Sequence, residues 1–104
     1  MLILLQNPKD MFAIHSVYLK PLEEVDEHLE AHRAFLKNLY AKGITICSGP
    51  QIPRTGGFIL MKASDKSEVL DIMKNDPYVI HGVADYSVIE FEVKSYAAGF
   101  GQFL

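Results

Sequence analysis

The order of strand-like and helix-like patterns between residues 11 and 93 constrains the fold of this chain more than any other feature. Residues 11–19, MFAIHSVYL, are rich in aromatic and β-branched side chains and predict a strand. Neither face of this strand is strongly polar, so we expect both faces to be covered. Residues 21–42 predict a helix, with Pro21 in its first turn, acidic residues early, lysines late and Gly43 as its stop.

The second half of the chain repeats this alternation with shorter segments. Residues 44–49 and 58–63 predict two strands, joined by a turn that is rich in proline and glycine. Ser64 and Asp65 predict the N-terminal cap of a second helix, which runs to about Lys74.

Residues 85–93 alternate along the chain and predict the last strand, with Ser87, Ile89, Phe91 and Val93 inward and two glutamates outward. The full order is strand, helix, strand, strand, helix, strand. It predicts an α+β domain of ferredoxin-like βαββαβ topology, with a four-stranded antiparallel sheet that carries both helices on one face. Little of the chain remains to cover the other face, so we expect a homodimer in which a second copy covers it.

Length and composition exclude several classes of protein. A chain of 104 residues can form one domain with one core. The formal net charge is −3 and the basic residues are scattered, which argues against a nucleic-acid partner. The single cysteine, Cys47, excludes an internal disulfide, and the apolar run at residues 2–5 is far too short for a signal peptide or a membrane span. We therefore expect a soluble, cytoplasmic protein.

The chain divides into three predicted parts. Residues 11–94 hold the six patterned segments and form the domain. Residues 1–10 are interpreted as an N-terminal extension, a cloning remnant or a misassigned start, because a natural-looking start follows at Met11. Residues 95–104, SYAAGFGQFL, form an apolar, glycine-rich tail that could pack across a subunit interface.

Two histidines four residues apart, His28 and His32, are the first candidates for a functional site. On a helical wheel His32 falls within the apolar stripe, and His28 lies on its shoulder. The pair lacks the HExxH pattern and an obvious third ligand, so we predict no metal site. Two interpretations of His32 stay open: a core histidine satisfied by one hydrogen bond, or a functional base oriented by a carboxylate.

Asp76 is the candidate partner of His32. It precedes Pro77 in the segment NDPYVIHGV, which follows the second predicted helix on the same side of the sheet as the first. In this architecture its carboxylate could reach His32. The structural alternative is that Asp76 simply caps a helical turn that begins at Pro77.

Four motifs in a fixed order, HLEAHRAFLKNLYAKG, SGP, TGG and NDPYVIHGV, make the chain resemble YciI-like proteins over residues 11–94. The resemblance implies a ferredoxin-like fold that dimerises as a dimeric α/β barrel, and a site centred on a histidine and an aspartate. The family histidine lies eleven residues before the glycine that ends the first helix, which here makes it His32 before Gly43. The family aspartate lies in the DP pair, here Asp76. Activities associated with the family concern small ring compounds, such as dehydrochlorination or lactone isomerisation.

The leading hypothesis is an enzyme that performs acid–base chemistry on a small organic acid or ring compound and uses no cofactor. Neutral His32 would transfer the proton and Asp76 would orient the imidazole. Ser48 could donate a hydrogen bond to the substrate, and Arg54 could clamp a substrate carboxylate. Each has a structural alternative, as a turn serine and as a solvated hairpin arginine.

Two other hypotheses stay open. A non-catalytic dimer could bind a small ligand or dock on another enzyme. A haem- or oxygen-using relative is a weaker candidate, because His15 and His81 are both interpreted as structural. Outside the site, Gly56 and Gly57 are expected to serve turn geometry, and Cys47 is expected to be buried in a strand.

Overall fold

The computed structural model describes the backbone of residues 2–104, and their side chains apart from those of residues 5–9. In chain order the elements are β1 (Leu2–Tyr18), α1 (Leu22–Asp26), α2 (Leu29–Ala41), β2 (Thr45–Pro50), β3 (Gly56–Met61), α3 (Lys66–Met73), α4 (Pro77–Ile80), β4 (Ala84–Ala97) and the 3-10 helix η1 (Phe100–Phe103). Within residues 2–104, no helix has the length and hydropathy needed to cross a membrane.

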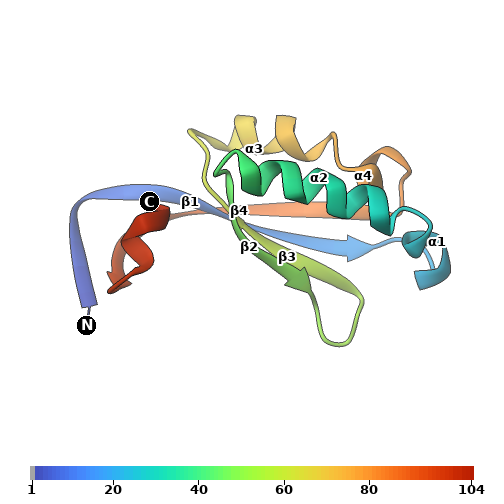
Figure 1. The fold of residues 1–104 in the computed structure, drawn as a ribbon, viewed down its shortest axis with the longest axis horizontal. Coiled ribbons are helices and arrows are strands. Elements are labelled where there is room, and N and C mark those ends of the chain that lie inside the picture. The colour runs from blue at the N-terminus through green and yellow to red at the C-terminus, as the bar shows by residue number, and fades with distance from the viewer. Residues whose placement is uncertain (1) are drawn as a thin grey trace.

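The four strands form one antiparallel sheet in the order β2-β3-β1-β4. Figure 1 shows α2, α3 and α4 together on one face of this sheet. This combination of element order and strand order is the ferredoxin-like topology, so the predicted fold class is confirmed.

The main core lies between the sheet and the helices α2 and α3. Phe12 and Ile14 of β1 are fully buried and belong to one cluster with Leu39 of α2 and with Val69 and Met73 of α3. Burial of each such side chain contributes roughly 1.5–3 kcal/mol, so this cluster fixes both helices on the sheet.

The face of β4 that meets the helices is the opposite of the one predicted. Tyr86 and Val88 lie opposite inward residues of β1 and therefore point to the helices, whereas Ile89 and Phe91 point away. Ile89 is 62% exposed and Phe91 is 41% exposed, whereas Val93, which was also predicted inward, is buried. The prediction was wrong because large apolar or aromatic side chains occupy both faces of this strand, so its pattern does not identify the face that meets the helices.

Much of the sheet face opposite the helices is exposed in the single chain, although Met11 on that face is buried. Val17 of β1 and Phe58 of β3 are both exposed on it, so the expectation that both faces of the first strand are covered fails for one copy. Cys47 is also exposed, contrary to the prediction, because β2 lies at the edge of the sheet.

The long helix predicted over residues 21–42 is divided into α1 and α2. The chain leaves helical geometry at His28, which has φ −111° and ψ 7°. The break allows Val25 of α1 to be buried against Tyr78 and Val83, while α2 lies across the sheet. Helix propensity depends on neighbouring residues and not on this tertiary packing, so the sequence predicted one continuous helix.

Gly56 and Gly57 allow close approach of backbones rather than forming a turn. Both lie within β3. A Cβ atom on Gly56 would overlap the carbonyl oxygen of Ser16, and one on Gly57 would lie 2.7 Å from the carbonyl oxygen of Gly49. The predicted turn role was therefore wrong. Gly43, in contrast, has φ 71° and ends α2 as predicted.

The two ends of the chain pair with each other. Residues 2–4 of β1 lie opposite residues 95–97 of β4, and the register shifts between Leu4 and Lys9. Figure 1 shows this arm and η1 at one end of the sheet, curling away from the helices. The segments predicted as an extension and a tail thus both contribute backbone to the sheet.

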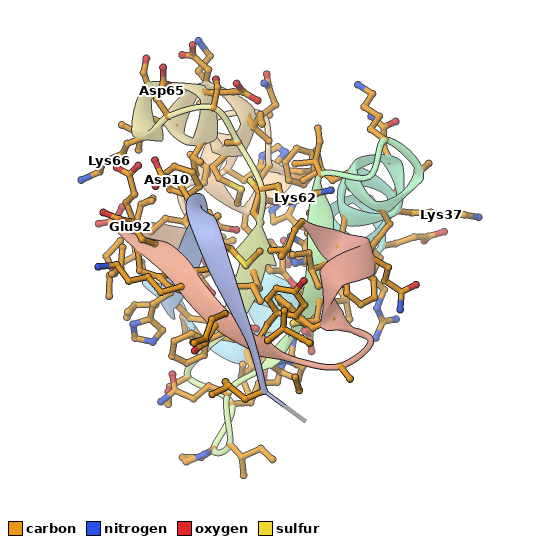
Figure 2. The ribbon with its side chains drawn as sticks, turned by 90° about the vertical axis from the view of Figure 1, so that its left-hand side faces the viewer. Asp10, Lys37, Lys62, Asp65, Lys66 and Glu92 are labelled. Atoms are coloured by element: carbon orange, nitrogen blue, oxygen red, sulfur yellow. The ribbon has the colours of Figure 1, made fainter. Side chains whose placement is uncertain are left out.

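Charges of both signs gather at the end of the sheet near the start of α3. Figure 2 shows Asp10, Asp65 and Glu92 near Lys66 in this region. A hydrogen bond with the Asp10 carboxyl raises the pKa of Glu90. Because acidic residues surround Lys66, this region is not a basic patch, in agreement with the expectation from the sequence.

Candidate active site

His32 lies near the start of α2 and hydrogen-bonds to Asp76. Its Nδ1 atom is 2.8 Å from Oδ1 and 3.0 Å from Oδ2 of Asp76. A carboxylate only accepts hydrogen bonds, so Nδ1 carries the proton and donates it. In the neutral imidazole, Nε2 is then left with a free lone pair. The structure thus brings together the two residues that the sequence suggested as a pair.

Asp76 is fully buried, and its carboxylate is surrounded by donors. Oδ1 accepts a hydrogen bond of 3.0 Å from the backbone N–H of Tyr78, and Oδ2 accepts a hydrogen bond from the hydroxyl of Tyr86. The bond from Tyr78 is also the N-cap interaction that begins α4. Asp76 therefore serves as a cap and as the partner of His32 at once. These donors offset a desolvation penalty of roughly several kcal/mol for the buried charge.

Tyr78 forms a flat wall against His32. The two rings stack with their centroids 3.9 Å apart and their planes at 6°. Burial raises the pKa of Tyr78 to about 12. Its hydroxyl is buried and has no hydrogen-bond partner among the described residues. The stack resists rotation of the imidazole and so keeps Nδ1 on Asp76.

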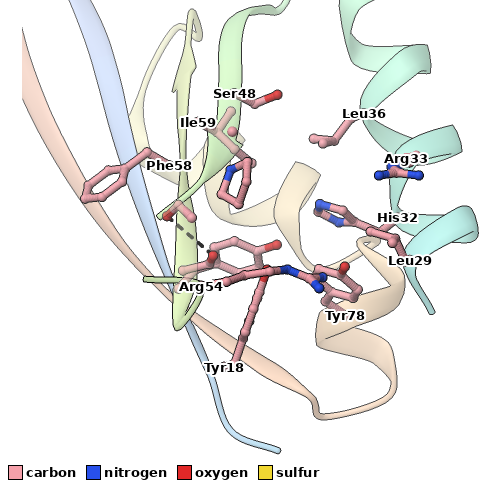
Figure 3. Close-up of a pocket in the computed structure, with 15 residues that line it drawn as sticks. Tyr18, Leu29, His32, Arg33, Leu36, Ser48, Arg54, Phe58, Ile59 and Tyr78 are labelled. Atoms are coloured by element: carbon pink, nitrogen blue, oxygen red, sulfur yellow. Dashed lines mark hydrogen bonds between the residues drawn. The ribbon is translucent and has the colours of Figure 1, made fainter. Parts of the chain in front are cut away.

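A pocket of about 380 Å³ opens between α2 and the strands β2 and β3, and His32 lines it. Figure 3 shows the His32 ring projecting from α2 toward Ile59, with Arg54 and Tyr78 beside it. The described residues that line the pocket include Arg33 and Arg54 but no carboxylate side chain. Its size suits a small ring compound, and its charges favour an anion.

Arg54 lines the pocket from the loop between β2 and β3, where it forms an ion pair. Its Nη2 atom is 2.6 Å from Oδ1 of Asp26. This hydrogen bond raises the pKa of Arg54 and lowers the pKa of Asp26 below its usual 3.8. The guanidinium also lies 5.6 Å from the ring centroid of Tyr18. Asp26 and Tyr18 thus fix one side of Arg54, and a guanidinium has further donors to offer.

Ser48 of β2 also lines the pocket, and Figure 3 shows it on the opposite side of the pocket from Arg54. Its Oγ atom is 2.6 Å from the hydroxyl of Tyr40 on α2. This bond joins the helix to the strand at the mouth of the pocket. Ser48 and Arg54 therefore both reach the pocket, but neither contacts His32 or Asp76 through a hydrogen bond in the described part of the chain.

Sequence reasoning missed three residues of this site, namely Tyr78, Tyr86 and Arg33. Tyr78 stands in the quoted segment NDPYVIHGV, two residues after Asp76, where an aspartate cap brings its neighbour toward its own carboxylate. Tyr86 was hidden by the wrong choice of face for the last strand. Arg33 follows His32 directly, and nothing in the pattern distinguishes it from a solvated helix residue.

The other histidines form contacts outside this pocket. His28 stacks on His81 with centroids 3.9 Å apart, and His15 accepts or donates a 3.0 Å hydrogen bond with the Gln51 side chain. Among the described residues, no three histidine, cysteine, aspartate or glutamate side chains are grouped to hold a metal ion.

Fold and site together define a class: a ferredoxin-like α+β domain with a histidine–carboxylate pair at the wall of a small pocket. A family model, the YCII-related domain, matches residues 3–92, and the chain belongs to this family. The resemblance noted in the sequence is thereby confirmed. No curated protein matches the chain.

A solved structure similar to this chain is the 5-chloro-2-hydroxyhydroquinone dehydrochlorinase (TftG) from Burkholderia phenoliruptrix AC1100, in complex with 2,5-dihydroxybenzoquinone. The two chains are 26% identical with a TM-score of 0.65, and the match covers 81% of this chain and 93% of that one. That relative is an enzyme, and it binds a small ring compound.

Proposed function

We propose that this protein is an enzyme in which His32 transfers a proton to or from a small organic acid or ring compound. The observation that carries the proposal is the hydrogen bond from His32 Nδ1 to the buried Asp76, at the wall of the pocket. This bond leaves Nε2 of the neutral imidazole as the available base. The reaction class is proton transfer of the isomerase, lyase or dehalogenase type.

The chain's own residues supply each role in this step. Nε2 of His32 takes the proton, and Asp76 stabilises the imidazolium that forms while keeping the ring oriented. Arg54 and Ser48 bind polar groups of the substrate from opposite sides of the pocket. The acid–base step itself requires no further group, so we propose that it proceeds without a cofactor.

The dehydrochlorinase supports the reaction class by analogy. Dehydrochlorination removes the elements of HCl: a proton passes to a base, the C–Cl bond breaks, and its electron pair leaves with chloride. An oriented imidazole suits the first part, and an electropositive pocket suits the developing negative charges.

Turnover of 5-chloro-2-hydroxyhydroquinone, followed as chloride release, tests the proposal. We expect the wild-type protein to release chloride and His32→Gln to lose at least about 100-fold in rate, the scale of acid–base catalysis. His28→Gln is the matched control, because His28 precedes the same helix and does not line the pocket. Equal rates in wild type and His32→Gln would contradict the proposal. Binding of 2,5-dihydroxybenzoquinone without any turnover would favour the alternative, a non-catalytic ligand-binding or accessory domain.

We further propose that two copies associate through the exposed sheet face, as the family resemblance implies. Phe58 and Ile89 are 52% and 62% exposed there, and burying such side chains favours association. Ile89→Glu should convert the dimer to a monomer in sedimentation analysis. Leu70→Glu, at a 51% exposed position on α3, should leave the dimer intact. A monomeric wild type would overturn this proposal.

A further inference from the structure

Tyr86 shares the Asp76 carboxylate with His32. Its hydroxyl donates to Oδ2, which is also 3.0 Å from Nδ1 of His32. The backbone N–H of Tyr78 donates to Oδ1, which lies 2.8 Å from the same Nδ1. Asp76 is 0% exposed, so bulk water does not compete for its oxygens. These three donors therefore govern how its negative charge is distributed.

The position of Tyr86 is set by the sheet. Tyr86 lies opposite Ser16 within the β1–β4 pairing, on the face that meets the helices. Asp76 is fixed separately, as the cap of α4, which packs on the same face. The hydroxyl thus reaches Oδ2 from a rigid strand, on a different element from either His32 or Asp76. Such an arrangement holds the plane of the carboxylate.

The Tyr86 hydroxyl also keeps its proton. Burial, followed by the charge of Asp76, raises the pKa of Tyr86 above its usual 10.0. A hydroxyl that stays protonated acts toward Asp76 as a permanent donor, and it does not serve as a base toward a substrate.

We propose that Tyr86 is a positioning residue that competes with His32 for Asp76 and so sets how strongly the carboxylate holds the Nδ1 proton. Loss of the hydroxyl leaves more of the carboxylate charge for Nδ1–H, and a stronger donor at the same place leaves less. The catalytic consequence rests on the proposed function, because it concerns the same acid–base site. The competition of Tyr86 and His32 for Asp76 does not depend on that function.

Proton NMR of the His32 Nδ1–H tests the competition directly. In Tyr86→Phe we expect this resonance to move downfield from its wild-type position, because its hydrogen bond to Asp76 strengthens. With 3,5-difluorotyrosine at position 86, whose hydroxyl is a stronger donor, we expect it to move upfield. Tyr96→Phe makes the same chemical change on the same strand outside the pocket and should leave the resonance in place.

Opposite shifts for the two variants support the proposal, whereas a merely structural tyrosine would not produce them. An unmoved resonance in both, or shifts in the same direction, would overturn it. The difluorotyrosine protein keeps the test decisive if Tyr86→Phe does not fold. With 5-chloro-2-hydroxyhydroquinone we expect Tyr86→Phe to raise kcat, because the stronger hydrogen bond to Asp76 stabilises the imidazolium that forms on His32. If the NMR shifts are opposite but the protein shows no turnover, the competition of Tyr86 for Asp76 is supported and only the proposed enzymatic function is rejected.

Discussion

Tyr78 lies flat against His32, with the ring planes only 6° apart, and its own hydroxyl is buried without a hydrogen-bond partner among the described residues. The stack and the unsatisfied hydroxyl have opposite effects on stability. The ring fills the space beside the imidazole, and the hydroxyl carries a desolvation cost of about 1–3 kcal/mol.

Substitution of Tyr78 separates these effects. Tyr78→Phe keeps the stack and removes the hydroxyl, so the free energy of unfolding should stay the same or rise by up to about 1 kcal/mol. Tyr78→Ala removes the ring and should lower it by about 3–5 kcal/mol. Urea denaturation measures both. A loss greater than about 1 kcal/mol in Tyr78→Phe would show that the hydroxyl has a partner.

Alkaline pH should destabilise the protein through its buried tyrosines. The pKa of Tyr86 and of Tyr78 is raised in the folded state, so the folded chain holds these protons more tightly than the unfolded chain. Their contribution to stability is complete below the usual tyrosine pKa of 10.0 and is lost as the pH rises above it. For Tyr78 this loss ends near its folded pKa of about 12.

Each such tyrosine lowers the free energy of unfolding by about 1.4 kcal/mol per pH unit within its window. Tyr86→Phe should therefore lose stability less steeply than the wild type between pH 10 and 11, as measured by urea denaturation at each pH. Parallel pH profiles for the two proteins would contradict this account.

The backbone contact at Gly56 should not tolerate a side chain. Gly56→Ala drives a Cβ atom into the Ser16 carbonyl and should lower the free energy of unfolding by about 3 kcal/mol or prevent folding. Gly49→Ala is the matched control, because a Cβ there meets nothing within 4 Å, and its effect should stay within about 0.5 kcal/mol. Thermal unfolding of both variants measures the difference, and similar stabilities would refute the close approach.

Arg54 should contribute to binding of an anionic ring compound. Arg54→Gln keeps a polar side chain but removes the charge, and should weaken binding of 2,5-dihydroxybenzoquinone by about tenfold or more. Lys66→Gln removes a charge at the start of α3, away from the pocket, and should bind as the wild type does. Calorimetry gives both dissociation constants. An equal affinity of the two variants would exclude Arg54 from the binding site.

Local signals in the sequence predicted most of the fold. Asp65 caps α3 and Gly43 ends α2, because capping depends on a few neighbouring residues. The break at His28 and the inward face of β4 depend on which surfaces meet in three dimensions, and these were predicted wrongly. The division into residues 1–10, 11–94 and 95–104 stays a prediction.

The candidate site was predictable to a similar degree. His32 and Asp76 could be paired because local sequence patterns place both of them in the helical layer on the same face of the sheet. Tyr86 was not predicted because the sequence pattern assigned the wrong face of its strand to the helices. Tyr78 was not predicted because no rule of residue spacing predicts its ring stack on His32.

The most direct test of the central claim is the tautomer of neutral His32, measured from the 15N chemical shifts of its two ring nitrogens. We expect Nδ1 to carry the proton, hydrogen-bonded to Asp76, and Nε2 to be unprotonated. A proton on Nε2 instead would remove the available base and contradict the proposed acid–base role of His32.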